Sequence, residues 1–163
     1  MITWDEALKK SLAIYLHSDD YAYFYGAKHG VVLTDGVMDS LIAAEPGFWS
    51  KYNGAQIRAF KDYARGKKGY DCSGFVSDIT GLNDWSGGLW ERAYDKTADI
   101  YQGVACSLLW LPGHVGIDIG LGYSLSFDAQ GGTCNLRRHK ENTIKWAGCG
   151  KLPGVDYTGA DNR

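Results

Sequence analysis

The chain has 163 residues, of which 45% are apolar and 22% are charged, and its net charge is −2. This length fits one domain with a substantial core, spanning residues 1–163. The weakly acidic balance argues against a nucleic-acid partner. No stretch is apolar for long enough to insert into a membrane, and the first six residues lack the basic start and apolar run of a signal peptide. We therefore expect synthesis and retention in a reducing cytoplasm.

The N-terminal part carries helical patterns. Thr3 and Glu6 form a capping box, and the apolar residues that follow recur at helical spacing to about residue 16. Two further helices are predicted, one starting at Thr34 and ending before Pro46, the other over residues 56–63.

The middle of the chain holds an aromatic segment and two more helical patterns. Residues 21–26 fit a short strand, the lip of a cleft, or plain core packing. An apolar helix is predicted from Cys72 to Thr80. A loop is predicted over residues 83–88 and a further helix over residues 89–100.

The second half changes to the alternating pattern of strands. Residues 114–119 and 123–127 alternate between small or polar and apolar side chains, and the Gly-Leu-Gly sequence between them predicts a hairpin turn. Further strands are expected at residues 134–138, 144–146 and 155–157. Helices followed by antiparallel strands indicate an α+β fold.

Cys72, between Asp71 and Ser73, is the residue with the clearest chemical signal. In the first turn of a helix, free backbone N–H groups and the positive end of the helix dipole stabilise a thiolate, the nucleophilic form of cysteine. The remaining cysteines form no C-x-x-C pair, so neither a metal site nor a cofactor is expected, and their roles stay open. They are Cys106, Cys134 and Cys149.

A cysteine nucleophile needs a base, usually a histidine that is held by an orienting group. His17 and His29 lie in polar loops. His139 follows two arginines and precedes a lysine, which predicts a solvated basic turn. His114 differs from these, because it opens a strand beside glycines that allow close approach.

The predicted hairpin provides the orienting group. If its turn centres on Leu121, His114 lies opposite Asp128, with Cβ atoms about 4.5–5.5 Å apart. A carboxylate at that place accepts the imidazole N–H and fixes its tautomer. A register slipped by two residues would bring Gln130 or Ser126 opposite instead, and Gln130 is the substitute for Asp128 as third residue.

Each of these residues also has a plainer interpretation. Buried free cysteines are common and inert, a strand histidine is more often structural than catalytic, and Asp128 is also suited to ending a strand. The conjunction of Cys72, His114 and Asp128, on a helix and two strands, is what indicates a catalytic site.

Two motifs resemble those of the NlpC-type cell-wall cysteine peptidases, papain-like enzymes of bacteria and their phages. They are residues 71–76, Asp-Cys-Ser-Gly-Phe-Val, and residues 113–120, Gly-His-Val-Gly-Ile-Asp-Ile-Gly. Residues 23–26 and the segment from Trp146 to Pro153 look like the family's entry and closing segments, so the resemblance covers most of the chain. It implies a papain-like fold in which Cys72 and His114 are catalytic. Asp128 with Ala129 looks like one version of the family's third position.

The resemblance implies hydrolysis of peptide bonds in peptidoglycan stems, typically beside D-glutamate, with bacterial peptidoglycan as the partner and no metal. Tyr23, Asp71 and Ser73 match positions that grip a substrate's free amine in some members, although Asp71 also suits a helix cap. Asp118 stands where the family often has an aromatic residue, and the insert over residues 28–69 is long. A monomeric phage endolysin that waits in the cytoplasm, or a delivered antibacterial effector, would fit.

Two rival functions remain. One is different acyl chemistry on the same scaffold, such as an N-acetylmuramoyl-L-alanine amidase or an acyltransferase. The other is a catalytically silent wall-binding module in which Cys72 is a core residue.

Overall fold

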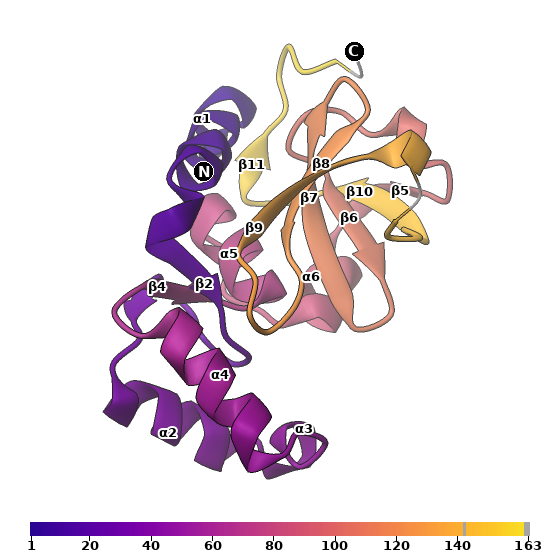
Figure 1. The fold of residues 1–163 in the computed structure, drawn as a ribbon. Helices are drawn as coiled ribbons and strands as arrows, with labels where there is room; N and C mark the ends of the chain where they lie inside the picture. Colours follow the sequence, from indigo (N-terminus) through magenta and orange to yellow (C-terminus); the bar gives the residue numbers. More distant parts are fainter. Residues whose placement is uncertain (142, 162–163) are drawn as a thin grey trace.

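A six-stranded antiparallel sheet is the largest element of the computed structural model (Figure 1). The structure describes residues 1–141 and 143–161. The strand order is β5-β10-β6-β7-β8-β9. These strands are β5 (Tyr94–Thr97), β6 (Leu108–Leu111), β7 (His114–Gly120), β8 (Tyr123–Phe127), β9 (Cys134–Arg138) and β10 (Gly148–Lys151). Together with six α-helices and two smaller sheets, all within the described residues, it confirms the mixed α+β class.

The hairpin of β7 and β8 has the predicted register. Ile117 lies opposite Leu125, and Asp118 lies opposite Ser124. A bulge shifts the pairing only next to the turn, where Leu121 has a positive φ of 58° between two glycines of positive φ. The alternation therefore points Val115, Ile117, Leu125 and Phe127 into the core, all of them fully buried.

The predicted N-terminal helices are confirmed. Helix α1 (Trp4–Leu16) begins at the Thr3–Glu6 capping box, in which each residue bonds the other's backbone N–H. Helix α2 (Asp35–Ala44) is capped by the Thr34 hydroxyl and ends before the proline. Helix α4 (Gly54–Ala64) has a second capping box. A short helix, α3 (Pro46–Trp49), joins α2 to α4.

Helix α5 (Cys72–Thr80) runs as predicted and packs on β7 and β8. Its carboxyl end stops at Gly81, whose φ of 74° is left-handed and suits glycine. Phe75, Val76 and Ile79 are fully buried on the sheet side. The first residue of α5 therefore sits at the end of a helix that is fixed against the central strands.

Three sequence predictions are wrong in detail. Residues 89–100 do not form one helix: helix α6 (Ser86–Arg92) begins inside the predicted loop, and the chain then enters strand β5. Residues 144–146 do not form the predicted strand, and a strand, β10, begins only at Gly148. Strand β6 was not predicted. Strand β5 is stabilised by β10, some fifty residues away in sequence, so local pattern carried no sign of it.

Two small sheets complete the fold. In one, β4 (Lys68–Tyr70) lies between β2 (Tyr21–Tyr23) and β3 (Val31–Val32). In the other, β1 (Ile2–Thr3) pairs in parallel with β11 (Val155–Asp156), which lies within the last of the predicted edge strands. The aromatic segment at residues 21–26 thus begins as a strand.

The buried apolar residues form two clusters. The larger lies between α1, α5 and the six-stranded sheet. The smaller joins α2, α3 and α4 to the segment that follows β2. These three helices form a group apart from the large sheet (Figure 1). Tyr25 packs against both clusters, so the two cores meet at this residue.

Candidate active site

Cys72 is the first residue of α5 and its side chain is partly exposed. Asp71 is the helix cap: its carboxylate accepts the Gly74 N–H at 2.6 Å. Because the first N–H groups of a helix have no partner within it, the Cys72 thiol stands beside free donors and the positive end of the dipole. This is the surrounding that the sequence predicted for a nucleophile.

The other three cysteines are free and buried. Burial raises the pKa of Cys106 and of Cys134 to about 12, and that of Cys149 to about 11. The Cys106 thiol donates to the carbonyl of Trp4 at 3.1 Å. These thiols stay protonated at neutral pH and act as small core side chains.

His114 lies between Cys72 and Asp128. Its Nε2 is 2.9 Å from Asp128 Oδ1, so Nδ1 is the ring nitrogen that remains for the thiol. Burial acts to lower the pKa of His114, but the hydrogen bonds to Asp128 and Cys72, and the electrostatic interaction with both groups, outweigh it and raise the pKa to about 9. The imidazole is therefore protonated at neutral pH.

Four side chains hold Asp128 in place. Oδ1 contacts His114 and accepts the Ser126 hydroxyl, while Oδ2 accepts the Asn135 amide at 2.9 Å and the Arg137 guanidinium. Burial alone would raise the pKa of Asp128, but the hydrogen bonds from His114, Ser126 and Arg137 and the Arg137 charge hold it below its usual value. The carboxylate is thus ionised and fixed in orientation.

Between the two candidates for the third position, Asp128 is the one that bonds His114. The side-chain oxygen and nitrogen of Gln130 are buried, and neither has a hydrogen-bond partner. The residues that support Asp128 were missed by sequence reasoning. Arg137 in particular was assigned to a solvated turn, yet it lies on β9 beside β8 with its side chain only 26% exposed.

His139 also differs from its prediction. It is buried, and its Nε2 lies 3.4 Å from Asp118 of β7. The basic residues around it suggested solvent, but Gly122 accepts the His139 backbone N–H and the chain turns the ring inward. His17 and His29 are exposed, in agreement with their prediction.

Trp146 covers His114. The two rings are stacked, with centroids 5.4 Å apart and an interplanar angle of 9°. A Cβ at Gly116 would come within 2.9 Å of the indole, so the glycine in β7 makes room for this stacking. The indole therefore shields one face of the imidazole from solvent.

A cleft of about 600 Å³ runs past Cys72 and His114. Tyr23, Asp71 and Ser73 all line it. The Tyr23 hydroxyl is held protonated, because burial, together with the nearby Cys72 and Asp71, raises its pKa well above the usual range. Asp71 and Ser73 bind the side chain of Lys28.

The outer walls of the cleft come from the helical insert and from the start of α6. On one side Tyr25 and Phe48 stack with centroids 3.6 Å apart. On the other stands Trp85, which is 66% exposed. Glu45 adds an exposed carboxylate to the insert side. The cleft is therefore open, aromatic and of mixed charge, and suits an extended polar chain.

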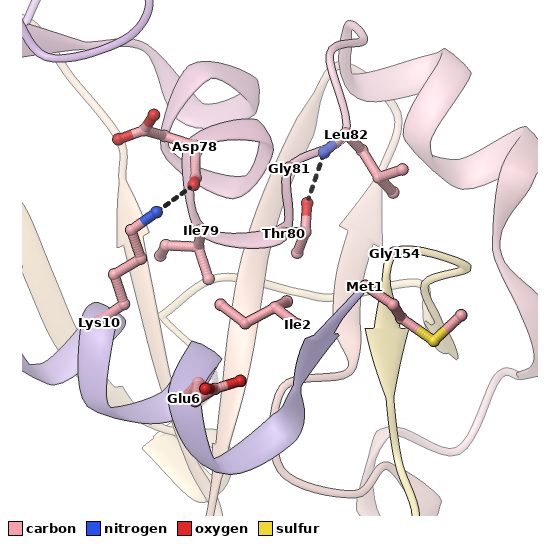
Figure 2. A pocket seen from close by; sticks show the side chains of 10 residues that line it. All are labelled: Met1, Ile2, Glu6, Lys10, Asp78, Ile79, Thr80, Gly81, Leu82 and Gly154. Atoms are coloured by element: carbon pink, nitrogen blue, oxygen red, sulfur yellow. Dashed lines mark hydrogen bonds between the residues drawn. The ribbon is translucent and has the colours of Figure 1, made fainter.

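A second hollow, of about 660 Å³, lies near the N-terminus between α1 and α5 (Figure 2). Its polar groups are engaged in structural contacts: Lys10 donates to the carbonyl of Asp78 (Figure 2), and Glu6 belongs to the capping box. It contains no nucleophile with an adjacent base.

Among the described residues, no group of three or more histidine, cysteine or acidic side chains is placed to hold a metal ion. Within the same residues, no helix combines the length and apolarity that a bilayer crossing requires. Comparison with protein-family models, with curated proteins and with solved structures finds no match to this chain.

Proposed function

We propose that this protein is a papain-like cysteine endopeptidase that cleaves stem peptides of bacterial peptidoglycan. The observation that carries the proposal is the row of contacts from Cys72 at a helix N-terminus, through His114, to Asp128. A thiol on a helix with a histidine and a carboxylate on an adjoining antiparallel sheet is the arrangement that acyl transfer by cysteine requires. The NlpC-type motifs supply the substrate class.

The proposed reaction begins with the proton on His114 and the negative charge on Cys72 sulfur. The thiolate attacks the scissile carbonyl carbon, and the pair of electrons from the C=O bond moves to the oxygen. Imidazolium His114 then donates its proton to the leaving amine as the C–N bond breaks, which leaves a thioester on Cys72. Water then attacks the thioester carbon while His114 takes its proton, and the C–S bond breaks, which releases the carboxylic acid product and restores the Cys72 thiolate and the His114 imidazolium.

Two donors are suited to the developing oxyanion. One is the backbone N–H of Cys72, which has no partner within the helix. The other is the Tyr23 hydroxyl, which the raised pKa keeps protonated and which lines the cleft beside the nucleophile. Donors fixed before reaction stabilise the tetrahedral intermediate by several kcal/mol in such sites, about 3 kcal/mol for each donor.

We propose cleavage beside D-glutamate by a phage endolysin, monomeric and made in the cytoplasm, that reaches the wall after release. The open cleft with aromatic walls supports a chain-like substrate held on both sides of the scissile bond. An amidase acting on the same polymer would use the same nucleophile and the same base, so the products separate the two.

The test is mass spectrometry of purified peptidoglycan after digestion by the wild-type protein and by Cys72→Ala. We expect new peptide termini only with the wild type. The control is Cys149→Ala, which removes a buried thiol outside the cleft and should leave the digestion pattern intact.

Whole stem peptides released from the sugar would make the protein an amidase. If Cys72→Ala still digests peptidoglycan, Cys72 is not the nucleophile. If the wild type yields no products from any of several wall types, the silent binding module is the better account.

A further inference from the structure

Lys28 extends into the wall of the cleft beside the nucleophile. Its Nζ donates to Asp71 Oδ1 at 2.9 Å and to Ser73 Oγ at 2.6 Å. These two acceptors lie on either side of Cys72 in sequence. The Lys28 side chain is 33% exposed and that of Asp71 is 11% exposed, so the ion pair faces the cleft and is only partly solvated.

The Asp71 carboxylate accepts three further hydrogen bonds at this wall. Asp71 Oδ1 also accepts the Ser73 hydroxyl at 3.2 Å and the Gly74 N–H, and Oδ2 accepts the Gly26 N–H at 3.2 Å. Since Ser73 donates to Asp71, its oxygen is free to accept from Lys28. A substrate ammonium at this wall would therefore have to displace Lys28 and would meet a second positive charge.

The position of Lys28 is built into the fold. The Asp71 N–H donates to the carbonyl of Ala27 at 2.9 Å, which holds the segment before Lys28 against the start of α5. A Cβ at Gly74 would come within 2.6 Å of that carbonyl and 3.0 Å of Lys28 Cδ. Only a glycine at this position lets the lysine stem lie across the helix end.

We propose that Lys28 is a specificity-determining residue that takes the place of a substrate ammonium against Asp71 and Ser73. This inference rests on the proposed function and deepens it. An ammonium has three N–H donors, two of which bind Asp71 and Ser73, so the third is available to a carbonyl or carboxylate of the bound chain. The enzyme then selects stem peptides whose N-terminal end is acylated, as in the intact wall, over trimmed peptides that end in a free amine.

This proposal changes the role that the sequence motifs implied for two residues. Asp71 and Ser73 no longer grip a substrate amine; they hold Lys28 and, through it, exclude that amine. Tyr23, the third residue that the motifs match to that amine, serves instead as the oxyanion donor proposed above. The motif at residues 71–76 gives no sign of the Lys28–Asp71 ion pair, because Lys28 lies more than forty residues before Asp71 and only the fold brings the two together.

The test compares two synthetic stem peptides that are identical except for a free or an N-acetylated N-terminus. We expect the wild type to cleave the acetylated peptide with a kcat/KM at least about 10-fold higher. Lys28→Met should reverse or abolish that preference, because Asp71 is then free to bind the peptide's ammonium. Lys28→Arg, which keeps the charge, should retain the wild-type preference.

The matched control is Lys51→Met. The Lys51 Nζ lies 4.0 Å from the centroid of the Phe48 ring, which lines the cleft, whereas the lysine bonded to Asp71 is Lys28. Lys51→Met should leave the ratio of the two peptides unchanged. If Lys28→Met fails to fold, the ratio of the two kcat/KM values in the wild type still decides whether the acetylated peptide is preferred.

The outcomes separate this inference from the proposed function. Wall digestion by the wild type with equal or better cleavage of the free-amine peptide would overturn the role of Lys28 only. An unchanged preference in a folded Lys28→Met protein would do the same. Failure of the wild type to digest any wall or peptide would overturn the proposed function, and the inference with it.

Discussion

Arg137 on β9 donates a hydrogen bond to the carboxylate of Asp128, the residue that directly follows β8. The next residue, Arg138, lies on the opposite face of the same strand, and its Nε donates to the Tyr123 hydroxyl at 2.9 Å. One strand thus directs two neighbouring guanidinium groups to opposite sides of the sheet. Only Arg137 contacts the network that holds His114.

The two arginines make a matched pair of variants. Arg137→Met should raise the pKa of Asp128, because the hydrogen bond and the positive charge of the adjacent guanidinium lower it in the wild type. The acidic limb of the pH–kcat/KM profile should move to higher pH. We also expect kcat/KM at neutral pH to fall about 10-fold. Arg138→Met should leave the profile in place. Superimposable profiles for both variants and the wild type would rule out a role for Arg137.

The raised pKa of His114 predicts a pH-dependent part of the stability. A group whose pKa rises on folding, here from 6.5 to about 9, stabilises the fold fully below pH 6.5, and this contribution disappears as the pH rises through 9. It amounts to at most about 3 kcal/mol. We therefore expect the free energy of unfolding, measured with urea between pH 6 and 10, to fall more steeply with pH for the wild type than for His114→Gln. If the unfolding free energies of the two proteins change with pH in parallel, the raised pKa of His114 is wrong.

The exposure of the four thiols predicts selective alkylation. At pH 7.5 iodoacetamide should modify Cys72 in the native protein, because the other three are buried and have pKa values raised to about 11 or 12. Peptide mapping by mass spectrometry identifies the site, and unfolded protein, with all four thiols modified, is the control. Faster labelling of a buried cysteine than of Cys72 would be inconsistent with the site described.

The stacking of Trp146 on His114 predicts an optical signal. Because a protonated imidazole quenches a stacked indole, the fluorescence difference between wild type and Trp146→Phe should change with pH, with a midpoint near 9. Trp146→Ala should lower kcat/KM about 5-fold by loosening His114, which corresponds to a contact of about 1 kcal/mol.

The control for this experiment is Trp90→Phe. Trp90 stacks on Trp110 at 4.7 Å, which places an indole against another indole in place of a histidine. Its difference spectrum should show no transition near pH 9. A transition of equal size in both difference spectra would assign the signal to something other than His114.

The parts of the site that the sequence predicted are those governed by local pattern. The alternation of residues 114–127 around a glycine turn fixed the register that brings His114 to Asp128. The helix beginning at Cys72 followed from its apolar spacing and its Asp71 cap. Both depend on neighbours within about fourteen residues, and such contacts leave a trace in the order of residue types.

The parts that the sequence did not predict depend on distant partners. Lys28 meets Asp71 across forty-three residues, and strand β5 is ordered by β10. Strand β10 is itself rich in glycine, because side chains at Gly148 and Gly150 would crowd Thr97 and Ala93. A strand of this composition has low intrinsic β-propensity, so no local rule identifies it.

The strand order β5-β10-β6 has a consequence for how the protein is made. The nascent chain emerges from the ribosome with its N-terminus first, so the hairpin of β7 and β8 is complete while β10 is still unsynthesised. Strand β10 must then insert between two strands made long before it, and Trp146, just ahead of it, arrives at His114 at the same time. A chain made only as far as β8 therefore contains Cys72 and His114 without the Trp146 ring that stacks on the imidazole, and the six-stranded sheet can close only after β10 has been made.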